Sequence, residues 1–449
     1  MYEAKYFSDE MLRQMIVPLF LEQFLVLLVG MIDTLVVSYA GEAAVSGVSL
    51  VNQFNNIFLN LFAALAAGGA VVTSQYIGRG KDELAGESAS QLLTASLVFS
   101  VGVTIPVLLF GRSLMRLLFG RVADDVMSAC MVYLRITALS YWSMAVYNAG
   151  AAMYRSIGDT KTTMLISLVT NVINLAGNLI GVFILHAGAA GVAWPTTISR
   201  IVSGVWITAL CLRRNQKVRY RVHWILRWNR GLMKMILGIA VPNGVENGTF
   251  NLVKVGVSSI VALFGTYQIA ANGVAQTIWS MSSVMGNCMG TIYLTVIGQC
   301  MGARDADAAD YYFHKLLRVS IKLSTAWNLF IIAILPLILR FYALGPETRS
   351  LVVILVVIHD SLNTFIFPCS GPLGNGLRAA GDVRFTMAVA VISTAGGRLI
   401  LSYLFGVVCG LGVIGITLAM CADWSVRAVI YLYRLRSGRW KNFQVLKNP

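Results

Sequence analysis

Long apolar stretches alternate with short polar connections along almost the whole chain. A helix that spans a lipid bilayer needs about 20 mainly apolar residues, and twelve segments of the sequence meet this requirement. We therefore predict an all-α integral membrane protein with twelve transmembrane helices, whose termini share one side of the membrane because the number is even. The predicted spans are residues 15–39, 48–76, 91–111, 127–153, 162–185, 190–212, 236–263, 270–299, 316–340, 350–376, 385–408 and 411–434.

The second half of the chain repeats the pattern of the first. The segment YRSIGDTKTTM (154–164) returns as LRAAGDVRFTM (377–387), 223 positions later (377 − 154 = 223). Glu22 and Glu246, each four residues after a proline, correspond at a separation of 224 (246 − 22 = 224). Because a nearly constant separation holds through six helices, the sequence predicts two pseudo-symmetric six-helix lobes that run parallel to each other.

Three regions follow from this repeat: an N-terminal lobe (1–212), a basic cytoplasmic linker (213–234) and a C-terminal lobe (235–449). The linker reads RRNQKVRYRVHWILRWNRGLMK, and its Trp224 and Trp228 among arginines fit a segment at the level of the lipid headgroups. A solvated basic connection that only enforces the topology is the simpler interpretation, and the sequence leaves both open.

Composition and charge agree with a membrane protein. Of the 449 residues, 57% are hydrophobic and only 12% are charged, with a mean hydropathy of +0.72; soluble domains carry about 25% charged residues. The net charge of +15 comes from Lys and Arg gathered in alternate connections, whereas connections such as GEAAVS and HAGAAG carry none. By the positive-inside rule both termini are cytoplasmic. Membrane lipid, not nucleic acid, is therefore the expected partner of this charge, in the cell membrane.

The sequence lacks the motifs of membrane-embedded catalysis. The four histidines are scattered without ligand spacing, and the cysteines lie mostly in apolar stretches, as small buried hydrophobic residues do. No phosphate-binding loop is present, so ATP is not the direct driver. We expect no enzyme and no cofactor, but a transporter driven by an ion gradient. A membrane-embedded enzyme or receptor is the alternative from another class.

Acidic residues inside the predicted spans are the candidate functional groups, because unpaired charges are costly at bilayer depth. Asp33 lies eleven positions after Glu22 (33 − 22 = 11), which returns a helix to within about 20° of its starting direction, so the two acids share one stripe about 16 Å apart. Asp33 is expected to bind the coupling cation or a proton. The alternative is a structural acid hydrogen-bonded to Asn174 or Asn178.

The other intramembrane acids have more open roles. Glu22 and Glu246 either line the cytoplasmic mouth of a cavity and select cationic substrates, or form salt bridges within their own lobes. Asp360 is favoured as a functional acid, whereas Asp423 is expected to pair with Arg427 at i+4. Polar residues on the second helix of each half are expected to line the cavity: Asn52, Gln53, Gln276 and Asn287.

Four sequence elements together resemble the multidrug and toxic-compound extrusion (MATE) family of transporters. They are MIDTLVVSYAGEAAVSGVSLVNQ, SQYIGRGKDE, YRSIGDTKTTM followed by NVINLAGN, and LRAAGDVRFTM. The resemblance covers essentially the whole chain. It implies twelve helices in two lobes and efflux of organic, often cationic compounds in exchange for H⁺ or Na⁺.

The resemblance also implies site residues. The family's first-helix aspartate falls on Asp33, and its fifth-helix polar residues fall on Asn171, Asn174 and Asn178. One branch of the family has Asp at the last of these positions, so Asn178 argues against a proton cycle through two aspartates. The helix-seven Glu and helix-ten Asp of another branch correspond to Glu246 and Asp360, although both lie at shifted positions. A Na⁺ ion near Asp33, or near Glu246 and Asp360, would follow.

The sequence therefore predicts a monomeric secondary antiporter that exports a small organic molecule, cationic by the family resemblance, with H⁺ or Na⁺ as the coupling ion. A flippase for lipid-linked precursors, from the same superfamily, is the runner-up. Such proteins carry a markedly cationic cavity, and Arg200 and Arg398 keep that alternative open.

Overall fold

The computed structural model describes residues 6–120, 123–214, 216, 218–342 and 344–446, and these residues form helices and connections with no β-strand. Two compact units are present. The N-unit comprises Arg13–Val241, and the C-unit comprises the chain from Pro242 onward together with the N-terminal residues up to Leu12. Both boundaries fall inside helices, so the first helix of each half begins in one unit and continues in the other.

The first half of the chain contains eight helical elements and a short helix in the linker. They are α1 (Asp9–Ser38), α2 (Glu42–Gly78), α3 (Asp82–Phe119), α4 (Asp124–Ala138), α5 (Tyr141–Ser156), α6 (Thr160–Leu179), the π-helix η1 (Ile180–Ile184), α7 (Gly188–Cys211) and, in the linker, α8 (Val222–Leu226).

The second half repeats this order with more interruptions. Its elements are α9 (Arg230–Val261), α10 (Thr266–Ser282), α11 (Val284–Gly302), α12 (Ala306–Ile338), the 3-10 helix η2 (Leu339–Phe341), α13 (Pro346–Ala379), α14 (Val383–Val391), the π-helix η3 (Ile392–Arg398), α15 (Leu399–Tyr403), the π-helix η4 (Leu404–Val408), α16 (Gly412–Arg436) and the 3-10 helix η5 (Arg439–Asn442).

Each of the twelve predicted spans coincides with a helix or a run of helices. Among the described residues, eight helices are long and apolar enough to cross a membrane, and the pair α4–α5, bent by 48°, makes a ninth. Helices α7 and α9 and the pair α10–α11 occupy the remaining three predicted spans. The interruptions between α4 and α5, between α10 and α11, and along α14–η4 were not predicted, because the apolar pattern continues through all of them.

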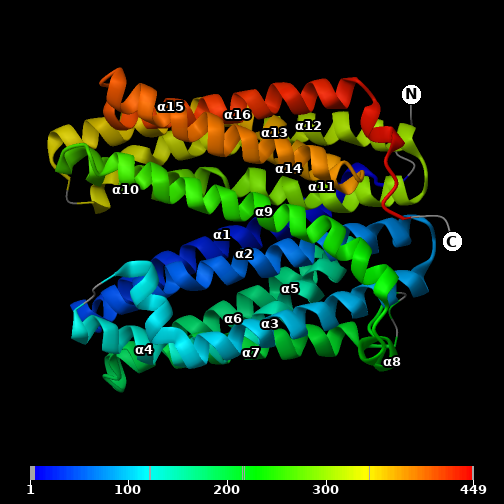
Figure 1. Cartoon of the computed structure of the whole chain (residues 1–449), viewed down its shortest axis with the longest axis horizontal. Helices are drawn as coiled ribbons and strands as arrows, with labels where there is room; N and C mark the ends of the chain where they lie inside the picture. The colour runs from blue at the N-terminus through cyan, green and yellow to red at the C-terminus, as the bar shows by residue number, and fades with distance from the viewer. Residues whose placement is uncertain (1–5, 121–122, 215, 217, 343, 447–449) are drawn as a thin grey trace. The chain divides into compact units, whose positions relative to one another are not determined.

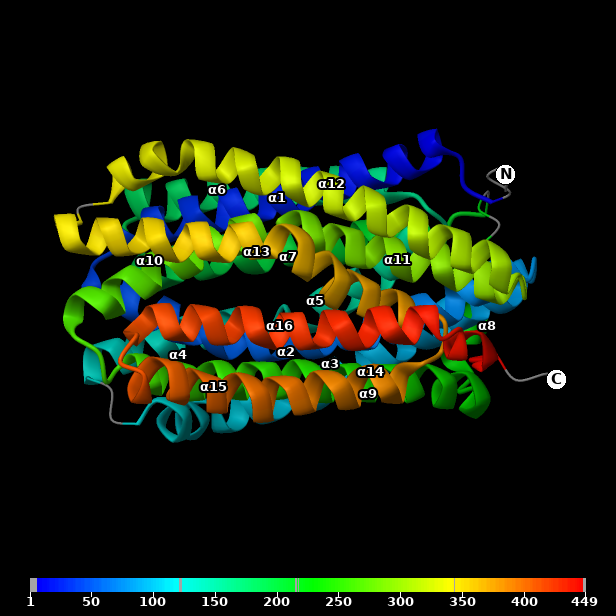
Figure 2. The ribbon, with the colours of Figure 1, turned by 90° about the horizontal axis from the view of Figure 1, so that it is seen from above.

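Within the C-unit, α13 packs against α10, α11, α12 and α16 and forms the centre of the bundle. Figure 1 shows α13 and α16 running side by side, and Figure 2 shows α12 beside α13. In the N-unit, α2 packs against α3, α4 and α5, and α7 packs against α4, α5 and α6. The two bundles thus pair their helices in a similar order, as the sequence repeat requires.

The repeated Arg-x-x-Gly-Asp motif forms the turn between two helices in each unit. Gly158 (φ 86°) and Gly381 (φ 103°) adopt the left-handed region that side chains rarely tolerate. Asp159 then caps α6, because its carboxylate accepts from the Thr162 backbone N at 3.0 Å. Asp382 instead accepts from Arg434 Nε at 2.6 Å. The motif is therefore first a structural device for a tight helix–helix connection.

Helices α6–η1 and α7 approach each other without side chains between them. A Cβ on Gly181 would lie 2.0 Å from the carbonyl oxygen of Gly191, and one on Gly191 would lie 2.6 Å from that of Gly181. The equivalent contact in the second half involves Gly415, whose Cβ would lie 2.5 Å from the Phe405 carbonyl carbon. Small residues thus allow the same backbone contact in both halves.

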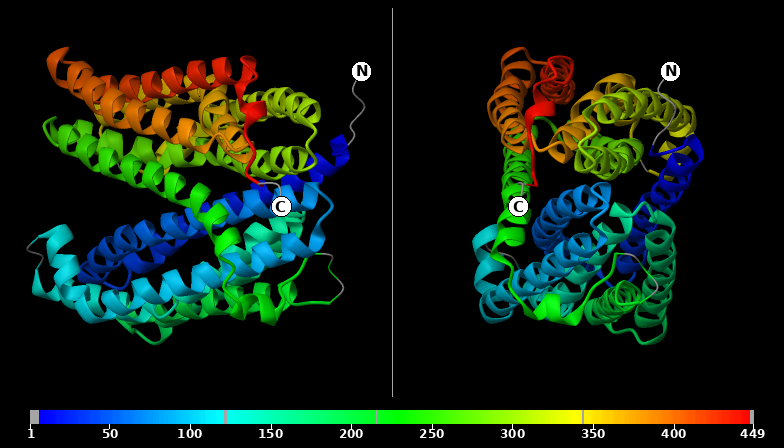
Figure 3. Two further views of the ribbon diagram at one scale, coloured as in Figure 1. Left: turned by 45° about the vertical axis from the view of Figure 1, so that its right-hand side comes forward. Right: turned by 90° about the vertical axis from the view of Figure 1, so that its right-hand side faces the viewer.

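The linker packs onto its own unit (Figure 3). Gln91 of α3 donates through Nε2 to the carbonyl oxygens of Trp224 and Arg227, both at 2.6 Å, and accepts from the Asn229 backbone N at 3.0 Å. Arg221 pairs with Glu83 at 2.8 Å. Helix α9 begins at Arg230, inside the range assigned to the linker, while the domain boundaries themselves remain a prediction.

The chain's N-terminal residues dock on the C-unit. The Phe7 backbone N donates to the Tyr312 hydroxyl at 2.8 Å, and that hydroxyl donates to the Phe7 carbonyl at 3.0 Å. Asp9 pairs with Lys315 at 2.6 Å. These contacts explain why α1 begins in a different unit from the rest of its length.

The Gly181–Gly191 contact gives a stability test. Gly181→Ala should lower the free energy of unfolding by about 1–3 kcal/mol, because the added methyl group forces two backbones apart. The measurement is the melting temperature of the purified protein in detergent. Gly102→Ala is the matched control, since a Cβ there meets nothing within 4 Å. Equal melting temperatures for the two variants would contradict the contact.

Candidate functional site

The N-unit contains an open cavity of about 810 Å³ whose wall mixes polar and apolar side chains. Its lining includes four charged side chains, two acidic and two basic, together with amides and hydroxyls from several helices. The lining residues of interest are Glu22, Asp33, Asn52, Gln53, Arg155, Asn171, Asn174 and Arg200. The structure therefore gathers at one cavity most of the residues that the sequence marks in the first half.

Asp33 is held by two amides from α6. Asn174 Nδ2 donates to Asp33 Oδ2 at 2.8 Å, and Asn178 Nδ2 donates to Asp33 Oδ1 at 2.9 Å. Asn174 Oδ1 accepts from the Thr196 hydroxyl at 3.2 Å, whereas the buried Asn178 Oδ1 has no hydrogen-bond partner. Asn178 is fully buried and is not among the residues that line the cavity, so the Asp33 carboxylate is the acceptor that a cation or a proton in the cavity would meet.

Glu22 has a different environment, although it lies on the same stripe of α1. Its carboxylate, 3% exposed, accepts from Arg155 at 2.7 Å, from Thr163 Oγ1 at 2.9 Å and from the Tyr147 hydroxyl at 3.4 Å. The salt bridge within the unit, one of the two alternatives for this residue, is therefore formed. Glu22 links α1 to α5 and α6 at the cavity wall.

The remaining predicted residues of the N-unit lie at the cavity without contacting Asp33. Asn171 donates to Ser167 Oγ at 3.3 Å, and Asn52 accepts from the Tyr133 hydroxyl at 3.3 Å. Gln53 is exposed on the wall. Of the three asparagines marked on α6, two thus contact the acid and one does not.

The C-unit has a second cavity of about 500 Å³ at the corresponding positions. Glu246, Gln276 and Asn287 line it, at 224 positions after Glu22, Asn52 and Ala63. Glu246 pairs with Arg378, which also donates to Asn375 Oδ1 at 2.8 Å. The position of Asp33 is taken by Val257, which is buried and lines the wall. The repeat therefore reproduces the cavity and its glutamate, but not an acid at the position of Asp33.

Asp360 is fully buried and is absent from the wall of the second cavity, where its neighbour His359 appears instead. Its carboxylate accepts from Ser282 Oγ at 2.8 Å and lies 2.6 Å from His359 Nδ1. Because Glu246 is paired with Arg378, the two acids have separate partners. Within the described residues, no group of three or more His, Cys, Asp or Glu side chains is placed to hold a metal ion.

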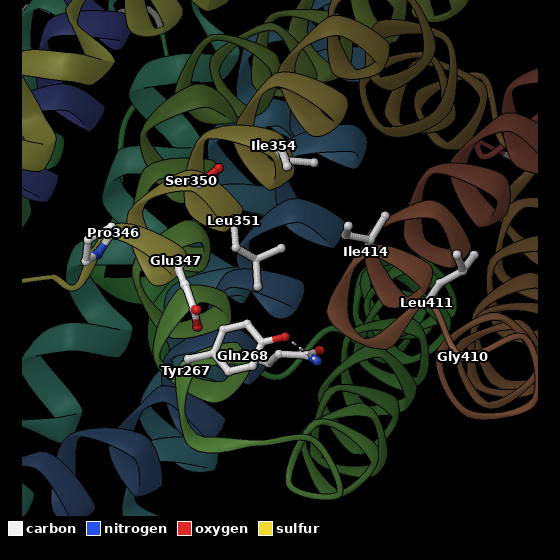
Figure 4. Close-up of a pocket in the computed structure, with 10 residues that line it drawn as sticks. All are labelled: Tyr267, Gln268, Pro346, Glu347, Ser350, Leu351, Ile354, Gly410, Leu411 and Ile414. Carbon is white, nitrogen blue, oxygen red and sulfur yellow. Dashed lines mark hydrogen bonds between the residues drawn. The ribbon is translucent and has the colours of Figure 1, made fainter.

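A third cavity, of about 570 Å³, lies near the first turns of α10, α13 and α16 (Figure 4). Tyr267, Gln268 and Glu347 are among its lining residues, and none of the predicted site residues is. Gln268 Oε1 accepts from the Val413 backbone N at 3.0 Å and so caps the first turn of α16. The arrangement serves local structure, since its amide is already committed to a helix end.

Sequence reasoning placed no role on several residues that the structure brings to these sites. Tyr147 and Thr163 hold Glu22, and His359 lines the second cavity. Arg155 and Arg378 lie in the repeated loop motif, so the repeat could have marked them as partners of the twin glutamates. The aromatic residues carry no comparable signal, because they resemble ordinary apolar positions of a membrane helix.

Two helical units that repeat one pattern, each with a polar cavity among membrane-length helices, define a multi-pass membrane transporter. The MatE family model matches residues 18–180 and again 242–404, two stretches 224 positions apart (242 − 18 = 224). The chain belongs to this family, whose members are transporters and not enzymes.

Similar proteins span almost the whole chain. An uncharacterized transporter, YisQ, of Bacillus subtilis is 27% identical over 433 residues, which cover 94% of this chain and 93% of that protein. A probable multidrug resistance protein NorM of Thermotoga maritima is 22% identical and covers 95% of this chain and 91% of its own length.

Solved structures share the fold. A MATE transporter in complex with MaL6 superposes with a TM-score of 0.89 at 19% identity, over 96% of this chain and 97% of that one. A MOP-superfamily transporter from Pyrococcus furiosus is described as having a binding pocket of reversed polarity. It superposes with a TM-score of 0.86 at 18% identity, over 96% of this chain and 98% of that one.

The Glu22–Arg155 pair gives a second test. Glu22→Gln should destabilise the protein by about 3–5 kcal/mol, because it leaves a partly buried guanidinium without its carboxylate. The double variant Glu22→Gln/Arg155→Met should recover part of this loss, since both charges are removed. Melting temperature in detergent is the measurement.

The control for this pair is Glu83→Gln, which removes one partner of the exposed Arg221 ion pair. Its effect should stay within about 1 kcal/mol, since exposed pairs contribute little. If Glu22→Gln shifted the melting temperature no more than Glu83→Gln, the pair would not stabilise the unit.

Proposed function

We propose that the protein is a monomeric secondary antiporter of the cell membrane that exports small organic molecules in exchange for H⁺ or Na⁺. The observation that carries this proposal is Asp33 at the wall of the N-unit cavity, held by two amide donors beside an unsatisfied amide oxygen. The relatives described as multidrug resistance proteins support organic substrates. Ion coupling is typical of the family to which the chain belongs.

The chemistry of the coupling step follows from this geometry. A carboxylate that accepts two amide hydrogen bonds still has lone pairs free to accept a further proton or to ligate a cation. A proton or Na⁺ that enters the cavity neutralises Asp33. Asn174 and Asn178 are then positioning residues, because they hold the carboxylate in one orientation. The cation is released when the cavity reaches the opposite side of the membrane.

The charge distribution supports an orientation with both termini in the cytoplasm. Lys and Arg residues concentrate in one set of connections and in the linker, and basic residues near membrane helices favour the cytoplasmic side. In this orientation Glu22 lies in the cytoplasmic half of α1 and Asp33 in the outer half. The acid proposed to exchange the ion thus lies nearer the outside, where an inward gradient supplies H⁺ or Na⁺.

Asp33→Asn tests the proposal. In proteoliposomes with an imposed pH gradient, or separately an imposed Na⁺ gradient, export of an organic dye should fall to the level of protein-free vesicles, because an amide cannot exchange a cation. The gradient that drives the wild-type protein identifies the coupling ion. Glu42→Gln, an exposed acid at the start of α2 that does not line the cavity, should retain wild-type transport. A wild-type, gradient-dependent rate for Asp33→Asn would contradict the role of Asp33.

A further inference from the structure

Arg398 is a buried cation that forms no salt bridge with the described residues. Its side chain lines the C-unit cavity, and the residue is only 9% exposed. It has no hydrogen bond or ion pair with any residue that the structure describes, and its buried Nε has no acceptor. The nearest compensating contact is the face of Phe250, with the guanidinium carbon 5.4 Å from the ring centroid. A cation–π contact leaves the guanidinium donors unsatisfied.

The acids around this cavity are already committed to other partners. Glu246 pairs with Arg378, and Asp423 pairs with Arg427 at 2.8 Å and accepts from Ser393. The pairing of Asp423 with Arg427 confirms the i+4 prediction. The third acid, Asp360, is engaged by Ser282 and His359, away from the wall. Asp423, whose charge also acts on Arg398, is thus shared with Arg427, and no carboxylate among the described residues forms a salt bridge with Arg398.

Other groups on the same wall also lack acceptors. Lys254 forms no ion pair with the described residues. The buried Arg427 Nε and Trp279 Nε1 have no hydrogen-bond partner. All the unsatisfied groups named on this wall are thus donors or cations, whereas beside Asp33 in the N-unit the unsatisfied atom is an acceptor, Asn178 Oδ1.

We infer that the C-unit cavity binds an anionic group, a carboxylate or a phosphate, of the molecule that the protein transports. This inference rests on the proposed transport function and replaces the expected cationic substrate with one that carries a negative charge. Arg398 can donate two parallel hydrogen bonds to such a group, the geometry in which guanidinium recognises carboxylate and phosphate. Arg427 and Trp279 offer further donors, and Lys254 adds a positive charge at the exposed side of the wall.

The repeat shows which change in the sequence places Arg398 in the second cavity. Corresponding positions are 223 apart at Gly158 and Gly381 but 224 apart at Gly188 and Gly412, so the second half gains one residue in between. The π-helix η3 lies in this interval and ends at Arg398. Because a π-bulge accommodates one extra residue and often occurs at functional sites, we assign the insertion to η3.

After the insertion Arg398 stands at the position of Asn174, the residue that holds Asp33 in the first half (398 − 174 = 224). Val257 stands at the position of Asp33 itself, and Lys254 at that of Gly30. One half of the repeat therefore offers an acid and the other a base at the same place in its cavity. A cationic substrate would meet like charges at this wall, which is costly in a desolvated site.

Equilibrium binding to the purified full-length protein in detergent tests the inference. The probes are carboxyfluorescein as the organic anion and ethidium as the organic cation, followed by fluorescence anisotropy. Carboxyfluorescein should bind, and Arg398→Met should weaken its binding by at least about 10-fold, because a charge-assisted bidentate contact is lost. Arg398→Lys should weaken it less, since the charge remains. Arg318→Met, an exposed arginine outside the cavity wall, should bind as the wild type does.

A lipid headgroup could supply the same anionic chemistry. Short-chain phosphatidic acid and inorganic phosphate are therefore added as competitors. Competition by phosphatidic acid alone, lost in Arg398→Met, would assign the site to a lipid phosphate, whereas equal competition by both would assign it to a soluble anion. Ethidium binding without carboxyfluorescein binding, or unchanged anion binding in a folded Arg398→Met, would overturn the inference.

This result is separable from the transport proposal. If Asp33→Asn stops gradient-driven dye export while Arg398→Met leaves anion binding unchanged, the antiport proposal is supported and the anion site is contradicted. If Arg398→Met loses anion binding but no gradient drives export by the wild-type protein, the anion site is supported and the antiport proposal is contradicted. The melting temperature of Arg398→Met shows that any loss of binding comes from a folded protein.

Discussion

The structure depends on one constraint: inside a bilayer, water cannot satisfy a charge, so the protein must do so itself. Glu22 and Glu246 each face the arginine of the repeated loop motif, and Asp423 faces Arg427 one helical turn away. The two glutamate–arginine pairs join different helices, α1 to α5 and α9 to α13, whereas the Asp423–Arg427 pair lies within α16. Against this background, the groups without partners mark the places where a ligand completes the structure.

The duplicated architecture separates what both halves need from what only one half does. The glutamate–arginine pair, the glycine turn and the close glycine crossing recur in both, and all three serve the connection of helices. Asp33 and Arg398 occur once each, at neighbouring places in the repeat. A residue that stabilises the bundle can be kept in both copies, whereas a residue that acts on an ion or a substrate takes a different charge in each. The asymmetry within the repeat is therefore the better guide to function.

Opposite polarities in the two cavities suit an exchanger whose cargo carries a negative group. In the proposed mechanism the cation binds at Asp33 and the anion binds at Arg398, so the two ligands need not compete for one carboxylate. Helices α1 and α9 each begin in one unit and continue in the other, so both units are linked through the chain itself.

The sequence alone determined the helical class, the twelve spans and the repeat, because lipid imposes a length and an apolar composition that can be read from residue order. It also marked Asp33 with its asparagines and the Asp423–Arg427 pair, since helical spacing limits the possible neighbours. Only the tertiary structure decided that Glu22 and Glu246 are paired, that Asp360 lies behind the wall and that Arg398 forms no salt bridge with the described residues. Whether a charge is satisfied depends on side chains from helices far apart in the sequence, and helical periodicity carries no information about which of them meet.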